Sequence, residues 1–277
     1  MEVSSIAHQR IKVITQHNDL DAEDDLAVEE PLEMQLGYYE SGKLVKKSIS
    51  VTMRTPGNDG ELAVGFLFTE GIISDGAQVK AVANHVLDEN KVLVTLSEDF
   101  QPKLQSLERN FYTTSSCGVC GKASIDAIKT VSAYQNNSDE MLLNKQVFFA
   151  LRDQLNRQQR IFESTGGLHA SALFDLDGKF IMLREDVGRH NALDKLIGNA
   201  LLNNQLPLAN HILLLSGRAS FELIQKAAMA GIKVVAAIGA PSSLAVALAE
   251  ESGITLIGFL KNEKFNIYSG FERISTT

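Results

Sequence analysis

The sequence predicts a mixed α/β protein, α+β overall, whose two halves follow different patterns. After residue 210, continuous apolar runs alternate with helical segments, which is typical of parallel strands covered by helices on both faces. Before residue 100, apolar and polar residues alternate on either side of short turns, which indicates antiparallel hairpins. We therefore expect a smaller antiparallel β-rich N-terminal domain and a three-layer α/β C-terminal domain.

Two hairpins are predicted in the N-terminal half. In the first, Leu32, Met34 and Leu36 alternate with polar or small residues, and the turn ESGK leads to a second strand at 44–53. In the second hairpin, strands at 79–87 and 91–96 surround the residues DEN. Between the hairpins, the segment ELAVGFLFTE predicts a helix with Asn58 or Asp59 as its cap.

The middle of the chain connects the halves. Residues 98–110 are polar and contain a proline, which predicts a linker or an exposed loop. Helical patterns follow at 123–131 and 145–158, and Asn144 is placed to cap the second of these helices.

The C-terminal half reads as a hairpin followed by alternating helices and strands. The residues DLDG form the hairpin turn between strands at 171–174 and 180–183. The later elements, in order, are the helix NALDKLIGNALL, strand HILLLS, helix FELIQKAAMAG, strand IKVVAAIG, helix SSLAVALAEESG and strand ITLIGFL. Right-handed crossovers then build the sheet. These patterns place three regions: 1–110, the β-rich domain; 111–165, the CxxC loop and helical connector; and 166–277, the α/β domain.

Charge and hydropathy narrow the class of partner. The chain has 26 basic and 34 acidic side chains, a formal charge of -8, which argues against a nucleic-acid polymer as partner. No apolar run is long enough to span a membrane, and the N-terminus MEVSSIAHQR lacks a signal-peptide pattern, so we expect a cytoplasmic protein. The negative net charge still permits an anionic small ligand, provided that Lys and Arg side chains cluster at its binding site.

Such a ligand is expected at the carboxyl ends of the strands, where loops meet helix N-termini. The four candidate loops are REDVGRHN at 184–191, SGRAS at 216–220, GAPSS at 239–243 and FLKNEK at 259–264. Small residues and hydroxyls at a helix start favour phosphate, and Ser216, Gly217 and Arg218 are candidates for it. Ordinary helix capping explains the same residues, so both interpretations stay open.

Two further candidates, Arg189 and His190, lie beside a glycine turn. Asp194 follows His190 by four residues, so on one helix face it could orient the imidazole. A surface ion-pair stripe gives the same spacing. His169, after two glycines, is compatible with a site or with a packed or exposed histidine.

Both cysteines of the chain lie in the segment TTSSCGVCGK at 113–122. A predicted helix follows them and Lys122 is adjacent, two features that lower the pKa of a thiol and favour the nucleophilic thiolate. Three chemistries are compatible with the pair. Structural zinc normally needs four ligands and no second pair is present, so we expect no structural metal. A thioredoxin-like site would open a helix within a βαβ unit rather than lie in a connector. A persulfide carrier needs an exposed thiol and a separate acceptor pocket.

Taken together, several motifs resemble the FdhD family, the sulfurtransferase accessory proteins of formate dehydrogenase. They are ELAVGFLFTEGII, SSCGVCG, TGGLHA, EDVGRHNALDK, SGRASFELIQK and LAVALAEESGITLIGF, and the similarity runs from about residue 31 to residue 268. The resemblance implies a cytidine-deaminase-like C-terminal domain and a homodimer. It also implies that sulfur is taken as a persulfide from a cysteine desulfurase and passed to the molybdenum or tungsten bis-guanine-dinucleotide cofactor of formate dehydrogenase.

The resemblance also assigns roles to residues. Cys117 matches the persulfide-carrying cysteine and Cys120 its CxxC partner. The guanine nucleotide of the cofactor is expected in the strand-end pocket, with Arg189, Arg218, Lys226, Lys261 and Lys264 offsetting its phosphates. The segment that matches the cofactor-binding residues of the family consists of Phe259, Leu260, Lys261, Asn262, Glu263 and Lys264.

Some features of the sequence depart from related proteins. His169 is followed by Ala170 and Ser171, and Ser116 precedes Cys117, so the zinc-deaminase motifs are missing and deaminase activity is not expected. FLKNEK lacks the proline, glycine and arginine that some relatives have there. Its lysines keep the positive charge, but they cannot form the bidentate hydrogen bonds to phosphate that an arginine forms. A cofactor-holding chaperone and a dithiol oxidoreductase remain alternatives to a sulfurtransferase.

Overall fold

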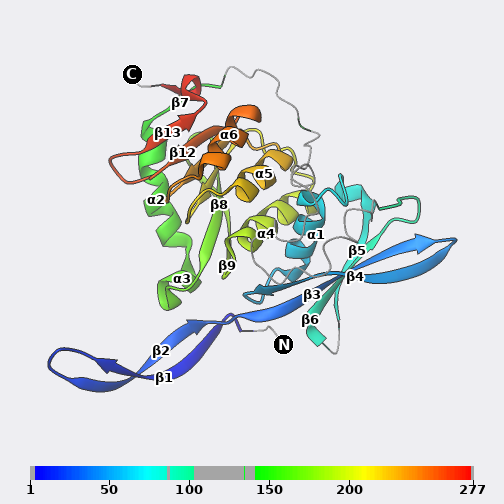
Figure 1. Cartoon of the computed structure of the whole chain (residues 1–277), viewed down its shortest axis with the longest axis horizontal. Helices are drawn as coiled ribbons and strands as arrows, with labels where there is room; N and C mark the ends of the chain where they lie inside the picture. Colours follow the sequence, from blue (N-terminus) through cyan, green and yellow to red (C-terminus); the bar gives the residue numbers. More distant parts are fainter. Residues whose placement is uncertain (1–3, 86–87, 103–133, 135–140, 276–277) are drawn as a thin grey trace.

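The computed structural model describes residues 4–85, 88–102, 134 and 141–275 of the 277-residue chain. Figure 1 shows a protruding two-stranded hairpin, a four-stranded sheet with one helix, and a six-stranded sheet between helices. The predicted mixed α/β class is confirmed. The predicted linker beyond residue 102 and the helix at 123–131 lie outside the described residues.

The hairpin consists of β1 (Ile6–Ile14) and β2 (Asp19–Ala27) and extends away from the body (Figure 1). Its register places Arg10 opposite Glu23 and Lys12 opposite Asp21, so opposite charges face each other across the strands. His8 Nδ1 lies 2.6 Å from Asp25 Oδ1. The sequence predicts no element here, because these strands are too polar to show a buried face.

The four-stranded sheet has the order β4-β3-β6-β5. Its strands are β3 (Glu30–Glu40), β4 (Lys43–Arg54), β5 (Val79–His85) and β6 (Asp88–Leu96). Both predicted hairpins are confirmed, since β3–β4 and β5–β6 are antiparallel. The prediction of an antiparallel sheet needs correction, because β3 pairs with β6 in parallel. The helix between the hairpins carries the chain back to the end of the sheet where β4 began. As a result, β5 has the same direction as β4, and β6 has the same direction as β3.

That connecting helix is α1 (Asp59–Thr69). Its start differs from the prediction, because Asn58 has a left-handed backbone with φ 59° and makes no side-chain capping bond. The Asp59 carboxylate instead accepts two 3.0 Å hydrogen bonds from the Arg54 guanidinium, which is fully buried. This bidentate pair fixes the end of β4 to the start of α1.

The six-stranded sheet has the order β13-β12-β11-β10-β8-β9. Its strands are β8 (His169–Asp175), β9 (Phe180–Asp186), β10 (His211–Leu215), β11 (Val234–Ala237), β12 (Thr255–Gly258) and β13 (Asn266–Ser269). As predicted, β8 and β9 form a hairpin and β10, β11 and β12 are parallel. The antiparallel edge strand β13 was not predicted, because it is too short to show a pattern.

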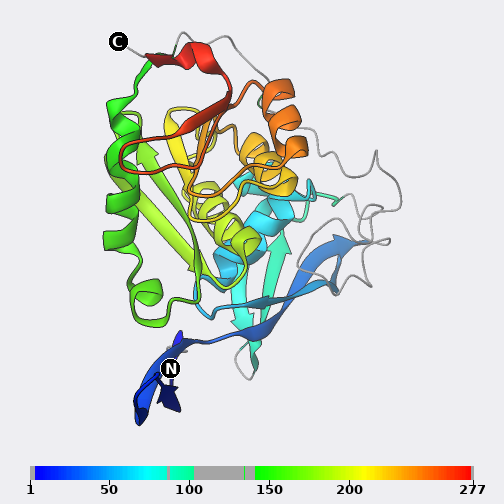
Figure 2. The same ribbon diagram turned by 60° about the vertical axis from the view of Figure 1, so that its left-hand side comes forward.

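Helices cover both faces of this sheet, which confirms the three layers (Figure 2). On one face, α2 (Gln146–Gln158) buries Phe148, Leu151 and Leu155 against the sheet. The predicted cap of α2 is present, because the Gln146 amide donates to Asn144 Oδ1 at 2.9 Å. The other face is covered by α4 (Arg189–Leu202), α5 (Phe221–Met229) and α6 (Ser243–Glu251).

The two halves of the chain share one hydrophobic core. Helices α1 and α4 cross at Gly65 and Gly198, where an added Cβ would lie 1.9 Å from the Asp194 and Glu61 carbonyl oxygens, respectively. Only glycine permits so close an approach of two backbones. A continuous apolar cluster therefore runs from the four-stranded sheet through α1 and α4 to the six-stranded sheet.

The remaining elements are short. Helix α3 (Arg160–Thr165) follows α2, and β7 (Leu143–Asn144) pairs in parallel with β14 (Ile274–Ser275) near the C-terminus. Short 3-10 helices span Gly76–Gln78 and Phe271–Arg273.

Candidate functional site at the strand ends

The predicted loops do meet at one edge of the six-stranded sheet. Strands β9, β10, β11 and β12 run in the same direction, so their carboxyl ends lie at this edge, and antiparallel β8 places its first residue, His169, there as well. Residues that are far apart in the sequence are thus brought together where ligands of open α/β sheets bind.

Backbone hydrogen bonds connect the loops beyond the strands. The Gly239 amide donates to the Gly217 carbonyl at 2.9 Å, and the Phe259 amide donates to the Gly239 carbonyl at 3.0 Å. Glycine is favoured at 239, because a Cβ there would lie 3.0 Å from the Gly217 oxygen and 3.1 Å from the Arg218 Cα, so the backbone of the neighbouring loop would have to shift. The loops therefore form a continuous backbone floor.

His169 lies against the first of these loops. A Cβ at Gly217 would lie 3.3 Å from His169 Nδ1, so the glycine leaves room for the imidazole. Burial, together with the positive charge of nearby Arg189, lowers the pKa of His169 below its ordinary value. In the ligand-free protein at neutral pH, the imidazole is therefore uncharged and can accept or donate a hydrogen bond.

The start of α4 contributes Arg189 and His190. Arg189 Nε is buried, and it finds no hydrogen-bond partner among the residues that the structure describes. Since buried donors are nearly always satisfied, this guanidinium is suited to an anionic ligand. His190 Nε2 lies 3.4 Å from Ser220 Oγ and 3.9 Å from the nearer Glu222 carboxylate oxygen, so it contacts the start of α5.

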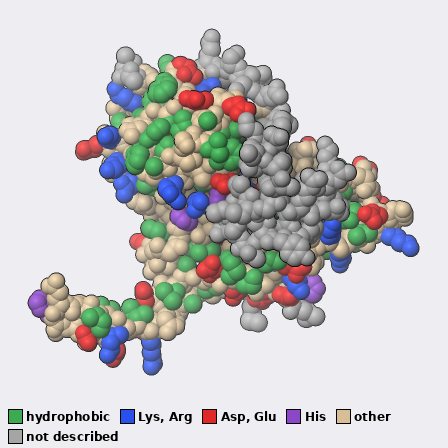
Figure 3. Space-filling view, viewed as in Figure 1, with side chains coloured by type: hydrophobic (Ala, Val, Ile, Leu, Met, Phe, Trp, Pro, Cys, Tyr) green, Lys and Arg blue, Asp and Glu red, His purple; other side chains and the backbone are tan. Residues whose placement is uncertain are grey.

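In the loop after β10, the two side chains differ in role. The Ser216 hydroxyl accepts a 2.8 Å hydrogen bond from the Ala170 amide, so it holds the start of β8 against β10. The Arg218 side chain is exposed and available to a ligand. Figure 3 shows Lys and Arg side chains gathered along one side of the C-terminal half, next to histidine side chains.

The segment 259–264 lies at the α2 side of the same edge. Phe259 is 43% exposed, whereas Leu260 is fully buried in the apolar core and supports the turn rather than lining a site. The turn closes through the Lys261 amide, which donates to the Lys264 carbonyl at 2.8 Å. Asn262 donates to the Asp153 carboxylate at 2.9 and 3.1 Å.

An open hollow of about 560 Å³ lies between this turn and α2. Arg152, Asp153 and Asn156 of α2 line it together with Lys261, Asn262, Glu263 and Lys264. Arg152 was not among the predicted residues, because only the tertiary packing of α2 brings it beside the turn. Arg152 adds a guanidinium to this hollow, whereas the cationic residues of the segment 259–264 are both lysines.

Lys226 does not belong to this site, which corrects the predicted set of phosphate contacts. Its ammonium group is buried, and it donates to both oxygens of Asp194 at 2.9 and 2.8 Å and to Thr69 Oγ1 at 2.8 Å. The expected pairing of Asp194 with His190 is replaced by this pairing. Lys226 therefore joins α5 to α4 and α1 beneath the loops.

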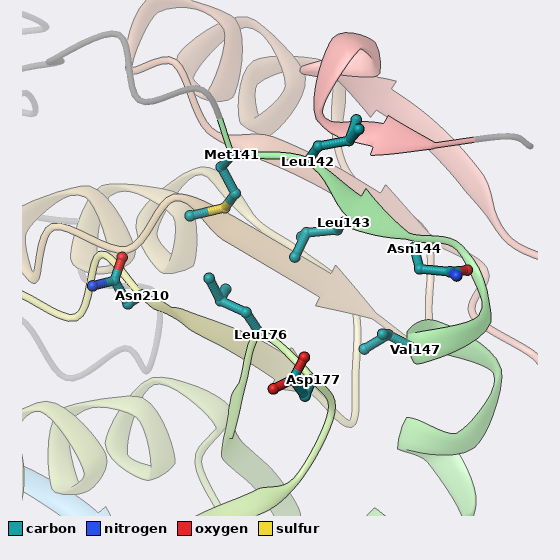
Figure 4. A pocket seen from close by; sticks show the side chains of 8 residues that line it. All are labelled: Met141, Leu142, Leu143, Asn144, Val147, Leu176, Asp177 and Asn210. Carbon is teal, nitrogen blue, oxygen red and sulfur yellow. The ribbon is translucent and has the colours of Figure 1, made fainter.

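A second cavity lies at the opposite end of the sheet. It has a volume of about 480 Å³ and is lined by residues before and within α2 and by the β8–β9 turn (Figure 4). None of the candidate residues lines it. In the described part of the chain, no group of three or more His, Cys, Asp or Glu side chains could hold a metal ion, and no helix is long and apolar enough to cross a membrane.

Comparison with known proteins identifies the family. Residues 27–275 match the model of the FdhD/NarQ family. The chain belongs to the FdhD/NarQ family.

Relatives at high identity are consistent with this assignment. The chain is 47% identical to the sulfur carrier protein FdhD of Mycolicibacterium paratuberculosis, over 99% of this chain and 100% of the relative. It is 46% identical to the protein of the same name from Streptomyces coelicolor, over 91% and 89%. The relative from Sulfurisphaera tokodaii is 42% identical, over 96% and 98%.

A solved structure supports the fold. A Desulfotalea psychrophila protein, described as a formate dehydrogenase accessory protein, superposes with a TM-score of 0.72 and 22% identity, over 98% of this chain and 100% of that one. At this identity the likeness concerns the fold alone.

In this FdhD/NarQ chain, the predicted carrier residues Cys117 and Cys120 lie outside the described residues, as does Lys122. The expected activation of the thiol by a helix N-terminus and a lysine stays a prediction.

Proposed function

We propose that the protein is a sulfurtransferase that carries sulfur as a persulfide on Cys117, from a cysteine desulfurase to the bis-guanine-dinucleotide cofactor that formate dehydrogenase requires. The observation that carries the proposal is the cationic strand-end site, in a chain whose relatives are named sulfur carrier protein FdhD. A carrier needs both a thiol and an acceptor site, and the proposal assigns these roles to Cys117 and to the residues at the strand ends.

In the loading step, the Cys117 thiolate attacks the outer sulfur of the donor persulfide. The S–S bond of the donor breaks, the donor cysteine leaves as a thiolate, and Cys117 becomes a persulfide. Cys120 tunes or protects this species. If Cys120 attacked it, sulfide would leave and a Cys117–Cys120 disulfide would remain, which the protein must suppress or use as a reset.

The acceptor substrate is a molybdenum or tungsten cofactor with two guanine dinucleotides. The residues at the strand ends fit its phosphates. Arg189 offers a buried guanidinium nitrogen that has no partner among the described residues. Arg218 offers an exposed guanidinium, and the glycines at 217 and 239 keep side chains off the backbone floor. Lys261, Lys264 and Arg152 extend the positive charge along the hollow beside α2. These cations bind and orient the dinucleotides.

Several finer features belong to the same proposal. The protein would act in the cytoplasm as a homodimer, and its C-terminal three-layer unit would be of the cytidine-deaminase type without deaminase activity. Formate dehydrogenase would be the recipient of the sulfurated cofactor.

A second candidate is a cofactor chaperone that holds the guanine dinucleotides without carrying sulfur. The strand-end site favours it as well, because the described residues that we assign to this site include neither cysteine. Activation of formate dehydrogenase in a strain that lacks the endogenous protein separates the two candidates. The carrier predicts that Cys117→Ala abolishes activation and Arg218→Ala reduces it. Normal activation by Cys117→Ala would favour the chaperone. A reversible Cys117–Cys120 disulfide at a physiological potential would favour a dithiol oxidoreductase.

A further inference from the structure

A buried ion pair lies directly beneath the loop that carries Arg189 and His190. Asp186, the last residue of β9, is 0% exposed, and Lys195, in the second turn of α4, is 1% exposed. Lys195 Nζ lies 2.7 Å from Asp186 Oδ2. The proposed cofactor contacts do not include either residue, so the pair needs its own explanation.

The second carboxylate oxygen of Asp186 holds the loop from both sides. Asp186 Oδ1 accepts hydrogen bonds from the Gly188 amide at 2.8 Å and from Asn191 Nδ2 at 3.1 Å. One of these donors precedes Arg189 and the other follows His190. A single carboxylate thus fixes the turn that sets where both side chains begin.

The N-terminal half closes this network through Thr55, just after β4. The Thr55 amide donates to Asp186 Oδ2 at 3.3 Å, its carbonyl accepts from Lys195 Nζ at 2.8 Å, and its hydroxyl accepts from the Val187 amide at 3.2 Å. Asn191 Nδ2 also donates to the Met53 carbonyl at 2.8 Å. The neighbouring residue Arg54 is itself held by Asp59, so Thr55 has little freedom to move.

We propose that Asp186 is a positioning residue for anion binding at the strand ends, and that Thr55 makes this binding depend on the N-terminal half. Buried ion pairs are weak evidence for stability, since apolar replacements of equal volume are often neutral or stabilising. Here every described partner of Asp186 belongs to the loop, to α4 or to Thr55. The pair therefore sets the geometry of Arg189. This inference rests on the proposed function, because it assumes that Arg189 binds phosphate.

The test measures binding of guanosine diphosphate by isothermal titration calorimetry to the full chain and to four variants. They are Arg189→Ala, Asp186→Ala, Asp186→Ala combined with Arg189→Ala, and Asp194→Asn as matched control. Asp194 is a similarly buried aspartate on α4 with its own lysine partner, and its hydrogen bonds among the described residues go to Lys226 and Thr69. Thermal unfolding of each variant reports how much is folded.

We expect Arg189→Ala to weaken binding by about tenfold or more, as for a lost hydrogen bond to a charged group. Asp186→Ala should weaken it by a similar factor, and the double variant should bind no more weakly than Arg189→Ala alone, because both changes remove the same contact. Asp194→Asn should lower Tm and leave the affinity of the folded protein unchanged. A purely structural role for Asp186 would instead add its effect to that of Arg189→Ala.

Two outcomes overturn the inference while the proposed function stands. They are wild-type affinity in folded Asp186→Ala, and fully additive losses in the double variant. If Arg189→Ala binds like the wild type, the proposed phosphate site fails and the inference falls with it. If Asp186→Ala does not fold, hydrogen exchange and binding measured on Asp186→Asn test whether Asp186 positions the loop. The amides of 187 and 188 must then exchange faster than in the wild type, and affinity must fall; unchanged exchange and affinity would reject the positioning role.

Discussion

The crossing of α1 and α4 makes a sharp prediction, because two glycines allow the helix backbones to touch. In Gly198→Ala, the new Cβ would lie 1.9 Å from the Glu61 carbonyl oxygen. Carbon–oxygen contacts normally lie at about 3.3–3.6 Å. The obstructing atom is backbone, so no side-chain rotation relieves the overlap. The helices must separate by more than about 1 Å, in the middle of the core shared by both halves.

The magnitude follows from two opposing effects. Overpacking of a core costs about 1–3 kcal/mol of stability. Because the clashing atom in Gly198→Ala is a backbone oxygen, which cannot rotate away, we expect a cost at or above the upper end of this range. Alanine regains about 1 kcal/mol of helix propensity relative to glycine. The net loss should be about 2 kcal/mol or more, which corresponds to a fall in Tm of about 4–8 °C for a chain of this size.

Thermal unfolding followed by circular dichroism measures this loss. Gly60→Ala is the matched control on α1, because the close neighbour of a Cβ there among the described residues is a methyl group of Val82, at 2.8 Å, on the edge strand β5. That methyl can move, so the control should change Tm by only a few degrees. A Tm of Gly198→Ala equal to or above that of the wild type would refute the reasoning about the helix crossing.

Four further predictions concern the site and its surroundings. Lys226→Met leaves Asp194 buried without its partner, so denaturant unfolding should show a loss of about 3–5 kcal/mol, while guanosine diphosphate affinity of the folded protein stays unchanged; a loss of affinity would return Lys226 to the site. The pKa of His169 is lowered by burial and by Arg189, so lowering the pH through that pKa adds a positive charge, and affinity for guanosine diphosphate should rise more steeply in the wild type than in His169→Gln; identical pH profiles would contradict this. The same shift predicts that His169 contributes a loss of stability as pH falls below its ordinary pKa, because the unfolded chain then binds more protons. Arg218→Ala and Lys261→Ala should each weaken guanosine diphosphate binding a few-fold, as exposed charges do, and the loss should shrink at high salt; unchanged affinity in both would remove these residues from the site.

Local signals in the sequence predicted much of the fold. The turns ESGK and DLDG stand between alternating segments, and the apolar runs of β10, β11 and β12 alternate with helices, so each unit could be recognised from its own residues. The parallel pairing of β3 with β6 could not, because it joins two hairpins across a helix. The β1–β2 hairpin escaped prediction since its strands bury little of their surface.

In the candidate site, too, some residues could be predicted from the local sequence and others depend on tertiary packing. Arg189, His190 and the glycine loops were predictable from their place after strands. The burial of Lys226 was not, because its partner Asp194 is 32 residues away on another helix. Asp186 does carry a local signal, because it lies two positions before Gly188, a spacing at which aspartate often accepts a backbone hydrogen bond. Thr55 and Arg152 depend on packing between distant segments, for which a single sequence carries no local pattern.

The most direct test of the central claim is mass spectrometry of the cysteine peptides after incubation with a cysteine desulfurase and cysteine. Free thiols are blocked before digestion, and Cys117→Ala and Cys120→Ala are treated in the same way. The account predicts one reductant-sensitive added sulfur on Cys117 in the wild type and in Cys120→Ala, and none in Cys117→Ala. With an active donor, a wild-type protein without added sulfur on either cysteine would contradict sulfur carriage and leave the cofactor chaperone as the better account.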